Sequence, residues 1–247
     1  MDAIAVSIDN SRRERNHREQ NHREHRVISR SLQKLLIPGP DFRLTTANDS
    51  ERGEVEAFIA QKFHDHHSAR ISTFLPALLS IHCGGTYTAA LGLNPATQGT
   101  MFLEQYLNQP AEQVIAALSH QPISRNSIVE VGNLVSSLNG ATALLYLMLL
   151  AVVQRSGFQW VIFTATPEVQ RSIEKIGFKI ASICEANPER LNGDSGQWGS
   201  YYDAKPWVTL GYVSESLESC HQNLMLASVL SLTAPAIAKL ADKLASL

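Results

Sequence analysis

Cysteine, charge and long apolar runs are all scarce in this chain of 247 residues. Its 3 cysteines are widely spaced and contain no Cys-x-x-Cys pair, which argues against a disulfide framework and against a structural zinc site. We therefore expect no metal site and a reducing, cytoplasmic location. Charged residues make up only 18% and the net charge is −2, so the chain as a whole offers no attraction to nucleic acid.

No run of apolar residues is long enough to suggest a membrane span. The longest, residues 141–153, is shorter than the roughly 20 residues that a bilayer requires. We therefore expect a buried helix there and no stable membrane span, with peripheral membrane contact left open. The first residues also lack the pattern of a secretory signal. Hydrophobic residues make up 44% of the chain, which is enough for a sizeable core.

A basic segment precedes an acidic body. Residues 11–34 carry eight Arg or Lys and three Glu, and near-repeats there place His17, His22 and His25. Spacings of five and three do not put all three imidazoles on one helical face. We expect residues 1–40 to be a basic, polar N-terminal arm, with metal or anion binding as the alternative. After Pro38-Gly39-Pro40 we expect one domain over 41–214 and an amphipathic helical segment over 215–247.

The body alternates between strand and helix patterns. A strand at 42–47 and a helix at 51–67 precede two apolar runs joined by Gly84-Gly85, which predict a hairpin. Further strands are expected at 127–135, 159–165, 178–183 and 207–213. Helices are expected after residue 139 and after Thr166, and residues 223–247 predict one helix or a pair broken at Pro235. This order predicts an α/β fold with a mixed sheet flanked by helices.

Four short segments carry a resemblance to a known family: FLEQYL at 102–107, IVEVGNL at 128–134, WVIFTAT at 160–166 and WGSYYD at 198–203. Over about 42–213 the chain resembles the thermostable hemolysin family. The fold of that family is similar to the GNAT acyltransferases and the N-acyl-homoserine-lactone synthases. The resemblance implies a GNAT-like, splayed central sheet of the α/β (α+β) class and an acyltransferase activity. The family name records a lytic phenotype and does not indicate a pore.

The resemblance also implies where a thioester donor binds. In GNAT folds the fourth and fifth strands splay apart, and the gap binds a pantetheine arm as an added strand would. The next helix directs its N-terminus at the phosphate. The phosphopantetheine-binding residues would be Val135, Ser137, Asn139, Gly140, Ala141, Thr142 and Thr166.

The phosphate turn departs from the coenzyme A pattern Gln/Arg-x-x-Gly-x-Gly/Ala. Gly140 fits, but Ser137 lacks a cationic or amide side chain and Thr142 replaces a small residue. This turn suits the single phosphate of an acyl carrier protein at least as well as a pyrophosphate. We expect acyl-phosphopantetheine, on an acyl carrier protein or as coenzyme A, to be a co-substrate, with no permanently bound cofactor.

Glu130 is the strongest catalytic candidate. A carboxylate within an apolar strand is costly to bury without partners, and burial would raise its pKa and suit it to act as a base or as an amine-binding group. An ion pair with Arg125 is the alternative. The homoserine-lactone synthases carry Glu-x-Ser-Arg here; Glu130 matches, but Gly132-Asn133 does not match Ser-Arg, so adenosylmethionine is not implied.

Other candidates surround this strand. Glu104 lies either near the substrate or in water, and Tyr202 is a candidate acid for the departing thiolate. The expected substrate-binding residues are Val131, Asn133, Leu134, Trp198, Tyr201 and Asp203. Asn133 would face away from Glu130 unless Gly132 marks a bulge. Cys83 and Cys184 fit buried thiols better than nucleophiles.

These expectations describe an acyltransferase. It would move an acyl group, expected to be fatty, from a pantetheine thioester to an amine acceptor such as an amino acid. Apolar residues 144–150 and the C-terminal helix would shape an acyl tunnel or simply pack the core. Two alternatives stay open: a membrane-active, hemolytic protein that uses the amphipathic C-terminus and basic arm, and a catalytically inactive GNAT-like scaffold.

Overall fold

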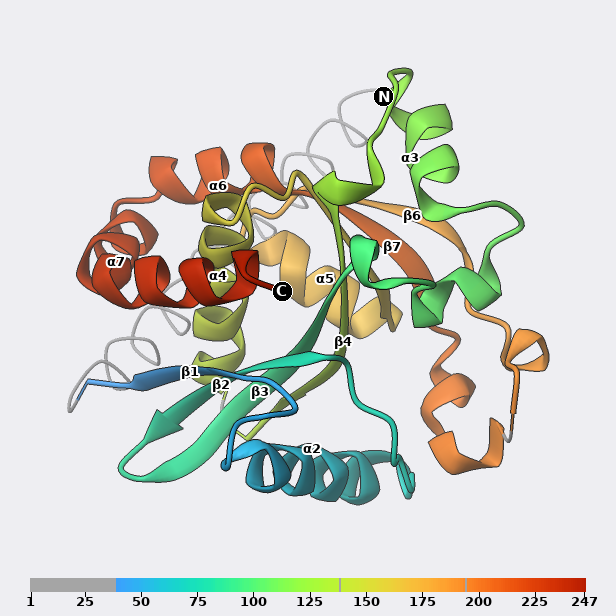
Figure 1. Cartoon of the computed structure of the whole chain (residues 1–247), viewed down its shortest axis with the longest axis horizontal. Coiled ribbons are helices and arrows are strands. Elements are labelled where there is room, and N and C mark those ends of the chain that lie inside the picture. The colour runs from blue at the N-terminus through green and yellow to red at the C-terminus, as the bar shows by residue number, and fades with distance from the viewer. Residues whose placement is uncertain (1–38, 138, 194) are drawn as a thin grey trace, which may run out of the picture.

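A computed structural model describes residues 39–137, 139–193 and 195–247 (Figure 1). Nearly all of the expected N-terminal arm therefore lies outside the described residues. Within the described residues, seven strands form one sheet in the order β1-β2-β3-β4-β5-β7-β6. The strands are β1 Asp41–Thr45, β2 Ala77–Cys83, β3 Thr86–Pro95, β4 Ile128–Ser136, β5 Trp160–Ala165, β6 Ile180–Glu185 and β7 Trp207–Tyr212.

Helices cover both faces of this sheet. They are α2 Arg52–His67, α3 Ala111–Ser119, α4 Asn139–Arg155, α5 Pro167–Lys175, α6 Val213–Gln222 and α7 Leu224–Ala245. Helices α4 to α7 lie on one side of the sheet, whereas α2 lies on the other, as Figure 1 shows. The mixed α/β fold with a flanked central sheet is confirmed.

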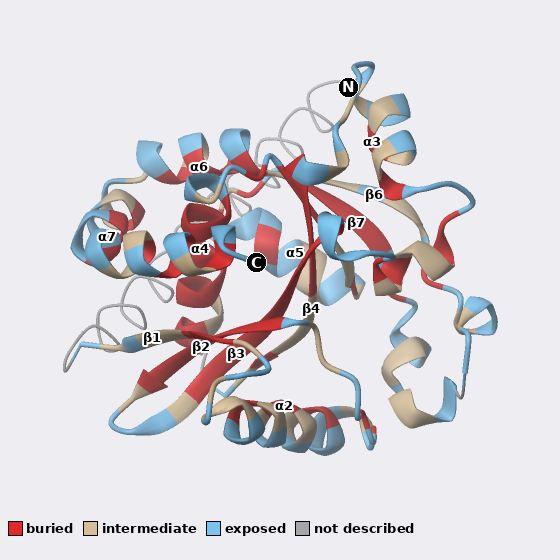
Figure 2. Cartoon of the chain, viewed as in Figure 1, coloured by how far each residue is buried: buried red, intermediate tan, exposed pale blue. Residues whose placement is uncertain are grey.

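Helix α4 is the centre of the larger core. Its residues from Ala143 to Val153 are buried, and the sheet lies on one side of it and α7 on another. The red segments of Figure 2 trace this layer through α4 and the middle strands. The prediction of a buried helix at 141–153 is confirmed. The apolar run is continuous because α4 is packed on all sides and has no solvent-exposed polar face along these residues.

The C-terminal helices break at Asn223 and not at Pro235. The Asn223 side chain accepts hydrogen bonds from the backbone N–H groups of Met225 (3.1 Å) and Leu226 (3.3 Å) and so caps α7. Pro235 lies within α7 on an exposed face. By length and composition α7 is the one described helix that would cross a membrane, yet it buries eight residues against the domain.

The two middle strands separate along their length. Strands β4 and β5 form the one parallel pair of the described sheet, and they pair only from Ile128–Trp160 to Val131–Phe163. Beyond that point β4 stays with β3 as far as Ser136, whereas β5 stays with β7 as far as Ala165. The edge of β4 that faces β5 therefore has no ladder partner over 132–135. The expected splay is confirmed.

A bulge in β4 lies where the strands part. The register with β3 shifts between the pairs Ala90–Val135 and Gly92–Gly132, and Asn133 has a φ of 51°. A Cβ at Gly92 would lie only 2.8 Å from Asn133 Oδ1 and from Leu75 Cβ, so only glycine permits this approach. The bulge at Gly132, which the sequence left open as an alternative to a regular strand, is present.

Candidate active site

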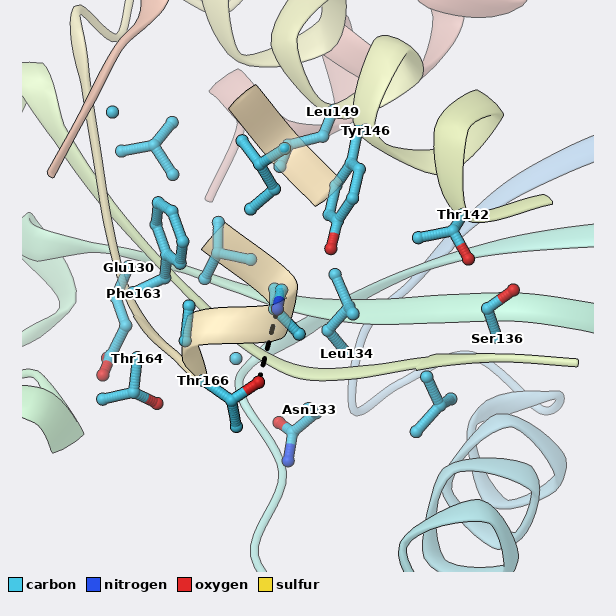
Figure 3. A pocket seen from close by; sticks show the side chains of 18 of the residues that line it. Glu130, Asn133, Leu134, Ser136, Thr142, Tyr146, Leu149, Phe163, Thr164 and Thr166 are labelled. Carbon is cyan, nitrogen blue, oxygen red and sulfur yellow. Dashed lines mark hydrogen bonds between the residues drawn. The ribbon is translucent and has the colours of Figure 1, made fainter. Parts of the chain in front are cut away.

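A cavity of about 550 Å³ occupies the splay (Figure 3). It passes through the sheet, because residues from both faces line it. Tyr146 and Leu149 come from α4 on one face, whereas Phe63 and His67 come from α2 on the other. The open edge of β4, the end of β5 and the start of α5 form its remaining walls. A channel of this shape can admit an elongated ligand from one side of the sheet to the other.

Glu130 lines the cavity and is only 2% exposed. Its Oε1 accepts a hydrogen bond from the backbone N–H of Leu103 at 2.8 Å. Its Oε2 accepts from the backbone N–H of Phe102 and from Asn94 Nδ2, both at 3.1 Å. A carboxylate has about four acceptor positions, so three donors orient the group and leave one position for a ligand.

No cationic side chain of the described residues forms an ion pair with Glu130. Burial raises the pKa of Glu130 above its ordinary value, although the three hydrogen bonds partly offset this, and the negative charge of Glu104 adds to the rise. The alternative partner considered from the sequence, Arg125, bonds to Glu104 and Glu112 instead. Glu130 is therefore a buried, oriented carboxyl group whose raised pKa suits proton exchange with an amine.

Glu104 occupies a different environment, outside the cavity lining. Its carboxylate accepts hydrogen bonds from the Arg125 guanidinium at 2.7 and 2.9 Å and from the backbone N–H groups of Met101 (2.9 Å) and Ala111 (3.0 Å). Although burial opposes the charged form, these bonds lower the pKa of Glu104 to about 2. A permanently ionised, fully bonded carboxylate holds the 101–111 segment in place and is unsuited to proton transfer.

Aromatic side chains form the wall beside Glu130. Trp198 and Tyr201 line the cavity with Phe63 and Phe102, and the Trp198 ring lies 5.6 Å from that of Phe102 and 6.1 Å from that of Phe63. The buried Trp198 Nε1 donates to no group of the described residues. This wall can hold an ammonium group or a flat substituent.

Tyr202 and Asp203 do not line the cavity. The Tyr202 hydroxyl bonds to that of Tyr106, and Asp203 is exposed. Tyr201 does line it and donates its hydroxyl to Thr164 Oγ1 at 3.1 Å, while burial raises its pKa to about 12. Of the two tyrosines considered for the acid, the structure places only Tyr201 next to the ligand space.

The residues expected at the phosphate end are divided. Thr142, Thr166 and Val135 line the cavity, and so does Ser136, which the sequence did not single out. Thr166 Oγ1 also accepts a bond from the backbone N–H of Val169 at 3.3 Å and caps α5. Outside the lining lie the exposed Ser137 and the buried first-turn residues Gly140 and Ala141. Asn139 is the first residue of α4.

Among the expected substrate residues of β4, Val131 and Leu134 line the cavity and Asn133 holds a loop. Asn133 Oδ1 accepts from the backbone N–H of Leu75 at 2.9 Å, and Asn133 Nδ2 donates to the carbonyl of Thr73 at 3.4 Å. These bonds place Leu75 against the bulge, so the Asn133 amide shapes the cavity wall although it also borders the cavity.

Several lining residues were not anticipated from the sequence. Lys62, His66 and His67 come from the last turns of α2, and burial and the neighbouring His66 lower the pKa of His67. Lys62 and His66 are four residues apart and so share a helical face, a spacing that is visible in the sequence itself. Tyr146 is the one hydroxyl between Ala143 and Val153. The C-terminal residues proposed for an acyl tunnel do not line the cavity.

Comparisons with known proteins identify one family and several similar structures. The thermostable hemolysin family model matches residues 45–217. The chain is similar to the acyl-homoserine-lactone synthase LasI, at 14% identity and a TM-score of 0.48 over 70% of this chain and 89% of that one. It is also similar to FeeM, an N-acyl amino acid synthase from uncultured soil microbes, at 14% identity and 0.47 over 73% and 95%.

A third similar structure is an acyl-CoA N-acyltransferase from Pseudomonas aeruginosa, at 14% identity and a TM-score of 0.41 over 70% of this chain and 99% of that one. Likenesses at this level do not bear on substrates. No curated protein matches the chain. The family match covers well over half of the chain, and the segments quoted from the sequence fall within it. The protein belongs to the thermostable hemolysin family.

Proposed function

We propose that this protein is an N-acyltransferase that moves an acyl group from a pantetheine thioester to an amine acceptor such as an amino acid. One observation carries the proposal: the unpaired edge of β4 opens onto a cavity that contains the buried carboxyl group of Glu130. An unpaired strand edge binds amides in the way a neighbouring strand does. A pantetheine arm contains two amides and has the length and width for such a slot.

The phosphate of the donor would lie at the start of α4. Backbone N–H groups and the helix dipole favour an anion there, and Ser136 and Thr142 add hydroxyl groups. The first turn of α4 offers no basic side chain. Because a single phosphate needs fewer donors than a pyrophosphate, we favour an acyl carrier protein in the cytoplasm as the partner, with coenzyme A as the alternative.

The acyl chain would enter the apolar part of the cavity on the side of the sheet that α4 and α5 cover. Side chains of α4, β5, α5 and the turn after α5 form this part: Leu149, Leu150, Val161, Phe163, Val169, Ile173 and Phe178. Burial of methylene groups against such walls contributes about 0.8 kcal/mol each. A fatty acyl chain fits this lining better than a short polar one.

The reaction follows from the position of Glu130. An acceptor ammonium would bind at the free acceptor position of the carboxylate, beside Phe102 and Trp198, and transfer a proton to it. The amine then attacks the thioester carbonyl, so that a C–N bond forms, the C–S bond breaks and the thiolate leaves. Converting the ammonium into an amide releases two protons, one to Glu130 before the attack and one from the nitrogen after the C–N bond has formed. One of these protons ends on the thiolate, from Glu130 or through water, and the other passes to water. Free N–H groups along the edge of β4 stabilise the oxyanion.

Mass spectrometry tests the proposal directly. The purified protein is incubated with octanoyl-acyl carrier protein or octanoyl-coenzyme A and a mixture of amino acids, and we expect a new acyl-amide together with free thiol. A folded protein that forms no acyl-amide with either donor would refute the proposal and favour a scaffold. Leakage of liposomes by the protein without any acyl donor would favour the membrane-active alternative.

A further inference from the structure

Tyr146 presents a buried hydroxyl group to the cavity. The residue lies in the second turn of α4 and is 3% exposed. Its ring packs edge-on against Phe178 with a centroid distance of 6.1 Å and an angle of 65°. Throughout residues 39–137, 139–193 and 195–247, no hydrogen bond to this hydroxyl is present, whereas Tyr201 and Tyr202 both bond through theirs.

The protein itself offers this hydroxyl no partner. Most buried polar groups in native proteins are hydrogen-bonded, whereas the Tyr146 hydroxyl lacks a partner among the described residues and opens onto the cavity, where water or a ligand can bond to it. The ring already fills its place against Phe178, so a phenylalanine would pack as well without a hydroxyl. An unpaired, buried donor that borders a cavity points to a ligand atom as its partner.

The position of the hydroxyl indicates which part of the ligand it meets. Figure 3 shows it pointing from α4 into the gap between Leu134 of β4 and Thr166 at the end of β5, between Thr142 on one side and Glu130 on the other. Along α4, Tyr146 lies four residues from Thr142, a rise of about 6 Å. If the phosphate lies near Thr142 and the thioester near Glu130, the hydroxyl faces the middle of the pantetheine arm.

We propose that the Tyr146 hydroxyl donates a hydrogen bond to the pantetheine amide that lies farther from the sulfur, and so selects donors that carry the full arm. The inference rests on the proposed function. The edge of β4 serves one side of the arm, and Tyr146 serves the side that faces α4. The residue is a donor-binding residue and takes no part in proton transfer.

Two thioesters that differ in this amide test the assignment. Octanoyl-pantetheine contains both amides, whereas octanoyl-N-acetylcysteamine keeps only the one next to the sulfur. We expect Tyr146→Phe to lower kcat/KM and affinity for octanoyl-pantetheine roughly three- to tenfold, the usual effect of losing one neutral hydrogen bond. Values for octanoyl-N-acetylcysteamine should not change. The control variant Tyr212→Phe removes a hydroxyl outside the cavity lining. It should leave kcat/KM and affinity unchanged for both thioesters.

Stability supplies the second readout. Because Tyr146→Phe removes an unpaired polar group, we expect the Tm of the free protein to stay unchanged or to rise. A fall of several degrees would show that the hydroxyl supports the fold and would overturn the assignment. An equal loss with both thioesters would overturn it too, since the contact would then be with the acyl group or the thioester.

The outcomes also separate this inference from the proposed function. If the unaltered protein binds both thioesters by calorimetry and Tyr146→Phe binds them equally well, only the role of Tyr146 fails. If the unaltered protein binds neither thioester and none of the acyl-carrier or coenzyme A donors yields product, the proposed function fails and the inference fails with it.

Discussion

Two carboxyl groups, the half-buried Glu104 and the buried Glu130, have opposite environments. Glu104 is bonded to Arg125 and to two backbone N–H groups, its pKa is lowered to about 2, and it lies outside the cavity lining. Among the described residues Glu130 has no cationic partner, its pKa is raised, and it borders the cavity. The comparison shows that partner and access, and not burial alone, decide whether a carboxyl group supports the fold or the chemistry.

The largest expected effect is a difference in enzymatic activity between variants of Glu130 and Glu104. Glu130→Gln removes the proton acceptor, and we expect kcat to fall by about 10²- to 10⁴-fold, the usual contribution of a general base. Glu104→Gln should keep the activity per folded molecule. Product formation measured by mass spectrometry at matched folded concentrations checks both variants.

This test needs a stability control. In the unaltered protein the Glu130 carboxylate accepts hydrogen bonds from two backbone N–H groups, and in Glu130→Gln the NH₂ group of the new amide faces one of these donors. We expect a loss of about 1–3 kcal/mol, so assays run well below the Tm of the variant. If Glu104→Gln lost as much activity as Glu130→Gln at equal folded fraction, the division between the two carboxyl groups would be wrong.

The second prediction concerns Arg125, the cation that is paired with Glu104. Arg125 bonds to Glu104, to Glu112 and to the carbonyls of Ala96 and Gly99. Arg125→Met keeps a long side chain but leaves Glu104 without its charged partner, so we expect a loss of about 2–4 kcal/mol in the free energy of unfolding. Denaturant unfolding measures it. Lys239→Met, at an exposed position of α7, is the control and should change stability by less than about 0.5 kcal/mol.

The pH dependence of the free energy of unfolding tests the lowered pKa of Glu104. A carboxyl group with a depressed folded pKa stabilises the fold above its unfolded pKa, and this contribution is lost as the pH falls toward the folded value. We therefore expect Glu104 to contribute to a loss of stability between about pH 4.5 and pH 2. Glu104→Gln should show a shallower slope in this window by denaturant unfolding at several pH values. Equal slopes would show that Glu104 is not held ionised.

The smallest effect concerns the pH dependence of activity through Glu130. A base must be ionised, so the acid limb of kcat/KM should lie above the ordinary pKa of a glutamate, because burial raises the pKa of Glu130. Asn94→Leu removes one bond to the carboxylate and should move the limb upward by about one pH unit or less. A limb that stayed in place would show that another group controls this part of the profile.

Local patterns predicted most of the fold. The hairpin around Gly84-Gly85, the strand that became β5 and the cap at Thr166 all depend on neighbours within a few residues. Of the two alternatives for residues 223–247, the single helix is correct, because α7 continues through Pro235 and the Asn223 side chain caps its start. The splay was expected through the family resemblance and not from periodicity.

The site was harder to predict, because its geometry depends on distant contacts. The sequence around Glu104 does not indicate its ion pair with Arg125. Likewise, the sequence around Tyr202 does not indicate the hydrogen bond between its hydroxyl and that of Tyr106. Tyr146 and the basic residues of α2 reach the cavity only through the packing of whole helices around the splay. Glu130 was identified correctly as a buried carboxyl group, since a charge inside an apolar strand is visible in the sequence itself.

Amide hydrogen exchange tests most directly whether the donor occupies the splay. Backbone N–H groups of residues 132–135 that face β5 have no ladder partner there, so they should exchange readily in the free protein. We predict that saturating octanoyl-pantetheine slows exchange in peptides covering 132–135 and leaves peptides covering 41–45 of the edge strand β1 unchanged. Unaltered exchange over 132–135 in a protein that has bound the thioester would contradict the account, because the ligand would then lie elsewhere.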